Sequence, residues 1–404
     1  MKVLHLSYND ISGGAARAMY RLHESLFKKG IDSQLLVVNK ECNKNNIVSI
    51  GLLNKLAIEI LNFLTKKLTP IVSKQPREQT SYNLISPSVS KIINALQPDI
   101  VHLHWIGAGM ASFSDLSKVN APIVWTMHDM WPFTVGKHYV PDSTYFHDEQ
   151  LSGEASADLF AKITLRQRQT FYTRNRCILV APSQWLANEA SNSALTRNQN
   201  IKVIQNTLDH NQYFAQDKKE CVELLNLKRN KVTFSFGAIS SEDDPRKGFQ
   251  YLKKAIQNLS PENKHKVQLV VFGTKKKGKG SLYGIDVHYL GSVKEDDELR
   301  LIYCASDYFI APSIQDNLPN TVVESLACGT PVIAFNVGGM PDLIKNDING
   351  FLAERIDEKS LQKSLEKAID TKFCGLLIHQ NSKKLRDYDV ISGEYCDLYR
   401  HVLD

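Results

Sequence analysis

Short apolar runs alternate with helical patterns along most of the chain. Each run holds four to six residues rich in Val, Ile and Leu, which is typical of a strand buried on both faces. The stretches between them, such as 15–29 and 88–96, repeat apolar residues at helical spacing. This alternation predicts a parallel sheet with helices on both faces. The strands predicted in the first half are Val3–Leu6, Ser33–Val38, Asp99–His104, Ile123–Met127 and Cys177–Ala181.

A second series of the same kind follows the polar stretch 196–214, which surrounds a short strand pattern at 201–204. Because one series suffices for one doubly wound domain, the 404 residues predict two such domains. The strands predicted in the second half are Val232–Phe236, Gln268–Phe272, Val287–Leu290, Tyr308–Ala311 and Pro331–Ala334, with helices at 248–258, 295–305 and 320–327 between them.

Composition is that of an ordinary globular protein. Hydrophobic residues make up 43% and charged residues 23% of the chain, which excludes disordered, collagen-like and disulfide-scaffold classes. The net charge of +6 lies entirely in residues 1–200, with 21 basic and 15 acidic side chains, so we expect an anionic partner there but no nucleic acid. The seven scattered cysteines predict free thiols in a reducing cytoplasm. No signal region and no membrane-spanning window is expected.

Ligands of open α/β sheets bind beyond the carboxyl ends of the strands, so residues just after the predicted strands are candidates for chemistry. Gly13 and Gly14 follow the first strand and open a helix, where backbone N–H groups favour an anion, although a plain glycine turn has the same pattern. His128 follows the fourth strand and is placed either to donate to a sugar hydroxyl or to form structural hydrogen bonds. His102 and His104 have a spacing that suits a metal, but no third ligand is evident, and a packing or substrate-lining role is favoured.

Two basic segments occur in the second half. Arg246 and Lys247 follow its first strand and start a helix, where adjacent cations can hold a diphosphate; a solvated basic helix start is the alternative. The run 275–279 is predicted to be a mobile surface loop.

The segment 311–331 holds the densest set of candidates and is predicted to run from strand through loop to helix. Asp316 lies in the loop, and Glu324 lies eight residues later inside an otherwise apolar helix. Because a buried carboxylate needs partners, and ribose hydroxyls are suitable ones, Glu324 is a candidate nucleotide-binding residue. Pro319 and Asn320 begin the helix, so neighbouring N–H groups face the loop.

These residues resemble the family 4 retaining glycosyltransferases of the GT-B fold, over essentially the whole chain. The resemblance is most specific at 316–342, including E-S-L-A-C-G-T-P-V at 324–332 and G-G-M-P-D at 338–342. The segments H-D-M-W at 128–131 and D-P-R-K-G at 244–248 are similar to a bacterial surface-polysaccharide branch of that family.

The resemblance implies two Rossmann-like domains that face a cleft, an acceptor-side domain at 1–200 and a donor-binding domain at 201–387. A last helix at 388–404 is expected to cross back to the first domain. Such enzymes transfer a sugar from a nucleotide diphosphate donor to an acceptor with retention of configuration. They usually need no metal, so no metal and no cofactor is expected.

The resemblance also implies a role for each candidate. His128 is expected to contact the transferred sugar near the reacting carbon, and Asp316 to contact the donor-sugar hydroxyls. Lys247, with Arg246, would neutralise the leaving diphosphate, and Glu324 would bind the ribose. The positions that present backbone groups to the donor are Gly13, Gly14, Asn317, Leu318, Pro319 and Asn320.

Two positions depart from the family pattern. Asp316 stands where the family usually has Glu, which shortens the side chain by one methylene and leaves the donor sugar open. The family's common G-R-[LIV] is G-A-I at 237–239, and Arg246 is the candidate replacement for the missing Arg. The single D-x-D, at 387–389, lies away from the predicted cleft and is interpreted as incidental.

The segment 52–74 combines Leu, Ile, Phe and Val with four lysines. It predicts either an amphipathic helix on an anionic membrane surface or a helix packed on the first sheet. With the charge excess of residues 1–200, we favour peripheral attachment at the inner membrane and a lipid-linked glycan acceptor, as in the synthesis of lipopolysaccharide, O-antigen or capsule. The alternatives are a GT-B sugar-nucleotide epimerase and a catalytically silent scaffold subunit.

Overall fold

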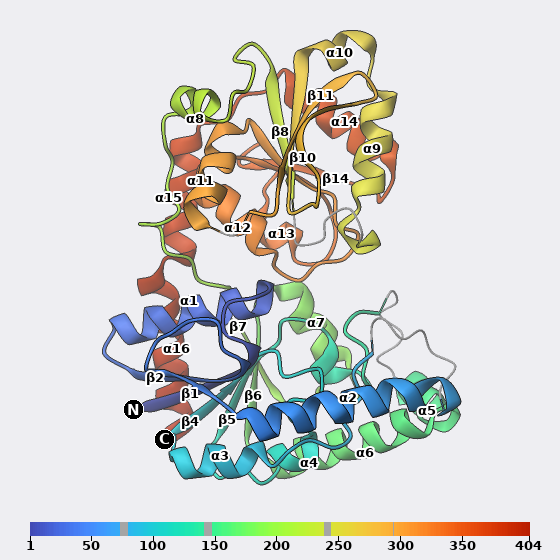
Figure 1. Ribbon diagram of the computed structural model, residues 1–404, viewed down its shortest axis with the longest axis vertical. Coiled ribbons are helices and arrows are strands. Elements are labelled where there is room, and N and C mark those ends of the chain that lie inside the picture. The colour runs from blue at the N-terminus through green and yellow to red at the C-terminus, as the bar shows by residue number, and fades with distance from the viewer. Residues whose placement is uncertain (73–79, 141–147, 238–243, 294) are drawn as a thin grey trace. The chain divides into compact units, whose positions relative to one another are not determined.

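The computed structural model describes residues 1–72, 80–140, 148–237, 244–293 and 295–404. The chain divides into two compact units, residues 1–206 with 391–404 and residues 207–390 (Figure 1). Within the described segments, each unit is built on one sheet of seven strands. The predicted α/β class with two doubly wound sheets is confirmed.

The first sheet is parallel throughout, in the order β3-β2-β1-β4-β5-β6-β7. All of the strands predicted in the first half are confirmed. The three-residue strand β3 was not predicted, because it is too short to form an apolar run. The strands are β1 (Lys2–Asn9), β2 (Asp32–Asn39), β3 (Ile47–Ser49), β4 (Ile100–Leu103), β5 (Ile123–Thr126), β6 (Cys177–Ala181) and β7 (Asn200–Val203).

Alternate residues of this sheet pack on opposite layers of helices. Leu4 and Leu6 of β1 join the core beneath α3, α4 and α6, whereas Val3 packs against α1 and the C-terminal residues 391–404. The C-terminal helix therefore packs on the first sheet. The helices of this unit are α1 (Gly14–Lys28), α2 (Leu52–Val72), α3 (Val89–Leu96), α4 (Phe113–Leu116), α5 (Asp148–Ala157), α6 (Leu159–Arg174), α7 (Gln184–Asn192) and α16 (Tyr388–Leu403).

The second sheet has the order β10-β11-β9-β8-β12-β13-β14 and is parallel except for the edge pair β10–β11. The predicted strands are again confirmed. The prediction of a mobile loop at 275–279 is wrong, because residues from Lys277 onward form β10. The strands are β8 (Val232–Gly237), β9 (Val267–Phe272), β10 (Lys277–Leu282), β11 (Ile285–Gly291), β12 (Tyr308–Ala311), β13 (Val332–Phe335) and β14 (Gly350–Ala353).

Two hydrophobic cores cover the faces of the second sheet. One includes Phe309 and Val323 with α11, α12 and α13, and the other includes Phe234 and Leu252 with α9 and α14. The helices of this unit are α8 (Lys218–Leu224), α9 (Phe249–Asn258), α10 (Pro261–Lys266), α11 (Asp296–Ala305), α12 (Asn320–Ala327), α13 (Met340–Leu343), α14 (Glu358–Ile369) and α15 (Gly375–Arg386).

All seven cysteines lie in described segments, and each is a free thiol. Among the described residues, no helix combines the length and the apolar composition that a membrane span requires.

Candidate active site

A group of charges around the buried carboxylate of Asp316 lies beyond the carboxyl ends of β8 and β12 in the second unit. The ammonium Nζ of Lys247 is 2.7 Å from Oδ2 of Asp316, and Nη1 of Arg246 is 3.8 Å from the same oxygen. The hydroxyl of Ser313 is 3.4 Å from it as well. Asp316 is only 6% exposed. The structure thus brings together three of the four residues predicted to be catalytic.

Asp316 is held in its charged form by its neighbours. Burial alone would raise the pKa of Asp316, but Lys247, Arg246 and the backbone N–H of Asn317 together hold that pKa below its ordinary value. With Asp244, which pairs with Arg246 at 3.3 Å, the group has two carboxylates and two cations. An incoming diphosphate must therefore compete with carboxylates for both cations.

Backbone contacts hold the two loops of this group together. Asp244 caps the 3₁₀ turn Pro245–Lys247, and the carbonyl of Arg246 accepts a 2.9 Å hydrogen bond from the N–H of Ile314. Gly248 follows with φ of +71°, and a Cβ there would lie 1.8 Å from the carbonyl oxygen of Pro312. Only glycine permits this approach, which places Lys247 beside the Asp316 loop.

A second glycine contact positions Asp316 itself. Gly338 has φ of +56°, and a Cβ there would lie 2.1 Å from the carbonyl oxygen of Asp316. The N–H of Gly339 donates to that oxygen at 3.0 Å. The Gly-Gly pair therefore packs against the loop that carries the carboxylate.

The donor-binding positions 317–320 form the start of α12. Asn317 and Leu318 are buried, Pro319 is the N-cap, and Asn320 is the first helical residue. The N–H of Asn317 donates to Oδ1 of Asp316 at 3.1 Å. A pocket opens beside this start and is lined by Phe236, Lys247, Ser313, Asp316, Pro319 and Thr321, among others.

Glu324 belongs to a separate group inside the helical layer. It is 2% exposed, and its Oε2 accepts a 3.0 Å hydrogen bond from the hydroxyl of Tyr303 in α11. The fold therefore supplies one partner for this buried carboxylate, and the contact of Glu324 with a ribose stays a prediction. Tyr303 was missed, since nothing in the sequence links it to a carboxylate 21 residues away.

The remaining candidates lie in the first unit, at the carboxyl edge of its sheet. Gly13, with φ of +102°, is the N-cap of α1, and Gly14 is the first residue of that helix. His128 follows β5. Burial lowers the pKa of His128 to about 4 although Asp129 opposes this shift, so the imidazole is neutral at pH 7.

The loop after His128 is tied down by its neighbour Asp129. That carboxylate accepts hydrogen bonds from the indole of Trp105 at 3.0 Å, from His138 at 2.7 Å and from the N–H of Trp131 at 2.9 Å. Asp129 and His138 were not among the predicted site residues. The contacts show that they hold the segment that presents His128.

The structure changes the interpretation of Arg246 and of the pair His102 and His104. A solvated basic helix start was the alternative for Arg246, but its guanidinium donates to the carbonyl of Gln315 at 3.1 Å and is thus bound to the Asp316 loop. Ala238 and Ile239, where the family pattern departs, lie outside the described residues. His102 and His104 do have a third histidine near them, because the ring nitrogens of His5, His102 and His104 lie within 4.8 Å of one another.

Comparison with known proteins gives the family. Residues 12–212 match Glycosyltransferase Family 4, and residues 230–371 match Glycosyl transferases group 1. The chain belongs to these glycosyltransferases, and the predicted resemblance to the GT-B enzymes of family 4 is confirmed.

Relatives include a bacterial galactosyltransferase and a protein of a bacterial cps region. An Escherichia coli UDP-Gal:α-D-GlcNAc-diphosphoundecaprenol α-1,3-galactosyltransferase is 29% identical over 44% of this chain and 47% of that enzyme. An uncharacterised 41.2 kDa protein of the Klebsiella pneumoniae cps region is 21% identical over 91% of this chain and 89% of that protein. The first four curated relatives are spanned over 46% to 62% of their own length.

The same fold occurs in solved structures. Anabaena HepE in complex with UDP-glucose aligns over 99% of this chain and 100% of that one, with a TM-score of 0.64 and 16% identity. At that identity the likeness shows the GT-B fold alone.

Proposed function

We propose that this chain is a retaining glycosyltransferase that moves a sugar from a UDP or GDP donor to a growing bacterial surface polysaccharide. The observation that carries the proposal is the contact of the half-buried cations Arg246 and Lys247 with the buried carboxylate of Asp316. It lies beyond the carboxyl ends of the strands in the second sheet, where ligands of open α/β sheets bind. The UDP-glucose complex of the HepE structure supports a nucleotide-sugar donor.

Lys247 acts on the leaving group in this proposal. Glycosyl transfer passes through an oxocarbenium-like state, while negative charge grows on the departing diphosphate. A cation 2.7 Å from a carboxylate already lies in a partly dry site, where its charge interacts strongly. When the diphosphate replaces Asp316 as the ion-pair partner of Lys247, the carboxylate of Asp316 becomes available to accept hydrogen bonds from the donor sugar.

A same-face reaction accounts for retention without a covalent intermediate. A donor phosphate oxygen assists the acceptor hydroxyl while the diphosphate leaves from the same face. Glu324 binds the ribose, and the backbone of 317–320, with Gly13 and Gly14, contacts the donor. No metal is required, because Lys247, Arg246 and the start of α12 supply the positive charge.

The acceptor is proposed to be lipid-linked because of the exposed face of α2. On this face, Leu53 is 82% exposed, Ile60 58% and Phe63 57%. The opposite face turns inward, where Ile58 is fully buried and the amide of Asn62 donates to the carbonyl of Ala108. An apolar stripe on the outside of a helix is typical of a membrane or protein interface.

Charge selects an anionic bilayer as the occupant of that face. The ammonium of Lys67 is exposed and lies 4.7 Å from the ring centre of Phe63, so a cation accompanies the apolar stripe. Residues 1–200 also carry the whole net positive charge of the chain. A basic amphipathic helix of this kind lies in the interface of anionic membranes. Of the predicted segment 52–74, residues 73 and 74 lie outside the described residues.

Donor binding can be tested by thermal denaturation of the full chain with UDP, GDP, ADP, CMP and dTDP, each with EDTA and with magnesium. A ligand at about 100 times its Kd stabilises by about 2.7 kcal/mol, which shifts Tm by several degrees. We expect one of UDP and GDP to do so in EDTA, and Lys247→Met to reduce the shift. No shift with any nucleotide would contradict the proposal and favour a scaffold subunit.

A further inference from the structure

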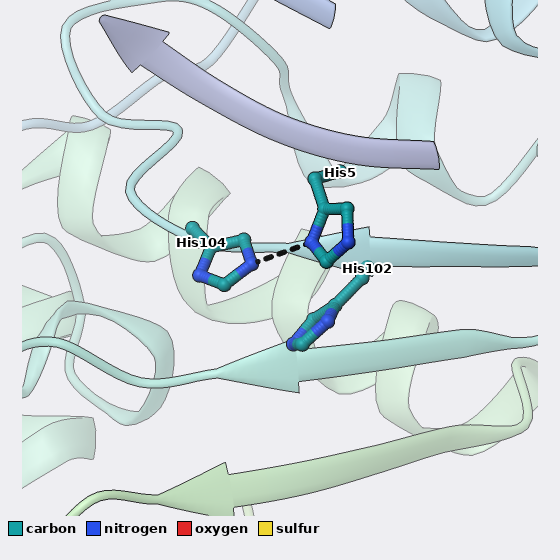
Figure 2. Close-up of side chains that lie close together, drawn as sticks. All are labelled: His5, His102 and His104. Carbon is teal, nitrogen blue, oxygen red and sulfur yellow. Dashed lines mark hydrogen bonds between the residues drawn. The ribbon is translucent and has the colours of Figure 1, made fainter. Parts of the chain in front are cut away.

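Four histidines line one face of the first sheet, on the side covered by α1 and residues 391–404. His5 on β1 is paired in register with His102 on β4, His104 comes two residues later, and His128 follows β5. Figure 2 shows the rings of His5, His102 and His104 gathered between neighbouring strands. The opposite face of the same strands is apolar.

Three of these rings form a chain of hydrogen bonds that ends at His128. Nδ1 of His5 lies 3.1 Å from Nε2 of His104, the contact drawn in Figure 2. Nδ1 of His104 in turn lies 3.1 Å from Nε2 of His128. His5 is fully buried and His104 is 3% exposed. These hydrogen bonds thus connect a buried histidine of the sheet to His128, the residue proposed to contact the sugar.

The three rings are neutral at pH 7. Burial, and after it the nearby histidines, hold the pKa of His5 and of His104 well below the ordinary value. Burial likewise lowers the pKa of His128. A neutral imidazole donates through one nitrogen and accepts through the other. Each hydrogen bond therefore dictates the direction of the next.

The buried end of the chain decides that direction. Nε2 of His5 is buried and has no hydrogen-bond partner among the described residues. An orphaned buried N–H is rarer than an acceptor left without a donor, so Nε2 is the bare nitrogen and Nδ1 holds the proton. His5 then donates to Nε2 of His104, and His104 donates from Nδ1 to Nε2 of His128.

We propose that His104, backed by His5, is a positioning residue that holds His128 in the tautomer protonated on Nδ1. The lone pair of His128, on Nε2, is taken by His104, so His128 acts in transfer as a hydrogen-bond donor through Nδ1 and not as a base. The consequence for transfer rests on the proposed function, whereas the tautomer does not.

A metal site explains the arrangement of these histidines less well than the hydrogen bonds do. His102 uses both of its nitrogens, at 2.6 Å from the hydroxyl of Tyr399 and 2.8 Å from that of Thr126. In the described structure, five of the six ring nitrogens of His5, His102 and His104 therefore have hydrogen-bond partners. A metal would have to break one of the two hydrogen bonds of His104 and one hydroxyl contact of His102.

The tautomer can be read directly by long-range ¹H–¹⁵N correlation on the full chain labelled at histidine. His128 is assigned from the signal that His128→Gln removes. His104→Phe removes the donor, whereas His104→Asn keeps an amide N–H₂ near the position of Nδ1. Tyr399→Phe is the matched control. It removes a buried hydroxyl from the neighbouring His102 and leaves the hydrogen bonds from His5 through His104 to His128 in place.

In the wild type we expect His128 to have a bare Nε2. His104→Asn and Tyr399→Phe retain this state, and His104→Phe loses it and lowers kcat about tenfold to a hundredfold with little change in donor KM. A bare Nδ1 in the wild type would overturn the proposal even if His104→Phe does not fold. An unchanged His128 signal in folded His104→Phe, or a stoichiometric transition metal in the purified chain, would overturn it too. A shifted tautomer with unchanged turnover would refute the role of His128 in transfer and leave the tautomer assignment standing.

Discussion

The ammonium of Lys247 and the carboxylate of Asp316 meet at 2.7 Å although 69 positions separate them in the chain. The contact joins the cation proposed to meet the diphosphate to the carboxylate proposed to meet the sugar. Because Asp316 is buried, each group is the principal compensation for the other. In the proposed function, donor binding is therefore an exchange of partners within this group.

The exchange predicts strong coupling between these two residues. Lys247→Met should lower kcat about a hundredfold or more, because the charge that it meets grows in the transition state. Asp316→Asn should also lower turnover. In a double-mutant cycle for stability, we expect the pair to show a coupling of about 1–3 kcal/mol. Additive effects within about 0.3 kcal/mol would show that the contact has no energetic role.

Variants at Glu324 and Tyr303 can distinguish an effect on nucleotide binding from an effect on packing. Glu324→Ala should weaken nucleotide binding about tenfold or more by leaving the ribose unmatched. Tyr303→Phe, the matched control, removes the hydroxyl that Glu324 binds inside the protein. It should cost about 1–2 kcal/mol of stability and still permit nucleotide binding. Calorimetric titration measures both, and equal Kd values for wild type and Glu324→Ala would remove Glu324 from the ribose site.

Gly248 is expected to be intolerant of any side chain. Gly248→Ala combines a φ of +71° with a Cβ 1.8 Å from a backbone oxygen, so the turn carrying Lys247 must move. We expect a loss of about 2 kcal/mol or more. Gly278→Ala is the control, because its φ is +105° but nothing lies within 4 Å of its Cβ. Urea denaturation compares the two, and equal losses would argue against the close contact.

Acid should destabilise the first unit well before its carboxylates titrate. The pKa of His128 is lowered to about 4, and those of His5, His102 and His104 lie well below the ordinary value, in each case mainly through burial. The unfolded chain, with pKa values near 6.5, therefore binds more protons, so stability is complete above about pH 6.5 and falls as the pH decreases.

Each of these histidines contributes about 1.4 kcal/mol per pH unit to that fall. All four tryptophans lie in residues 1–206, so their fluorescence follows this unit. We expect its Tm to decrease steeply between pH 6.5 and 5, and less steeply in His5→Phe. A Tm that is flat over this range would mean that the histidines are hydrated or already charged.

The exposed face of α2 should determine membrane binding. Ile60→Glu with Phe63→Glu should abolish sedimentation of the chain with vesicles containing phosphatidylglycerol, because each change places a charge in the apolar interface. Leu377→Glu in α15, a position that is 58% exposed, is the control and should bind as the wild type does. If the double variant sedimented with vesicles as fully as Leu377→Glu does, the exposed face of α2 would not be the membrane-binding surface and would be assigned to another partner.

The strands were predictable where burial on both faces leaves a continuous apolar run, as in Val267–Phe272. Lys277–Leu282 was not, because the sequence KGKGSL has no such run and its side chains are mostly exposed. Its strand form comes from backbone pairing with β11. Apolar patterns in a sequence predict strands whose side chains are buried. An exposed edge strand has few buried side chains and therefore lacks such a pattern.

Motifs in the sequence single out the candidate site residues, but their contacts could not be predicted. Asp316 and Lys247 stood out separately, and nothing in the sequence pairs two charges in loops 69 residues apart. Glu324 was predicted to bind a ribose because a buried carboxylate needs partners, but the partner that α11 supplies, Tyr303, was not predicted. Likewise, the spacing of His102 and His104 is visible in one strand, but the proximity of His5 depends on the pairing of β1 with β4.

The most direct test of the account is a transfer assay with the purified full chain. Candidate UDP and GDP sugars are incubated in EDTA with a short-chain lipid-diphosphate sugar acceptor in anionic vesicles, and the product is examined by NMR at its new anomeric carbon. We predict an acceptor lengthened by one sugar, with the donor's anomeric configuration and with loss of activity in Lys247→Met. An inverted product would contradict the retaining mechanism, and activity unaffected by Lys247→Met would contradict the proposed site.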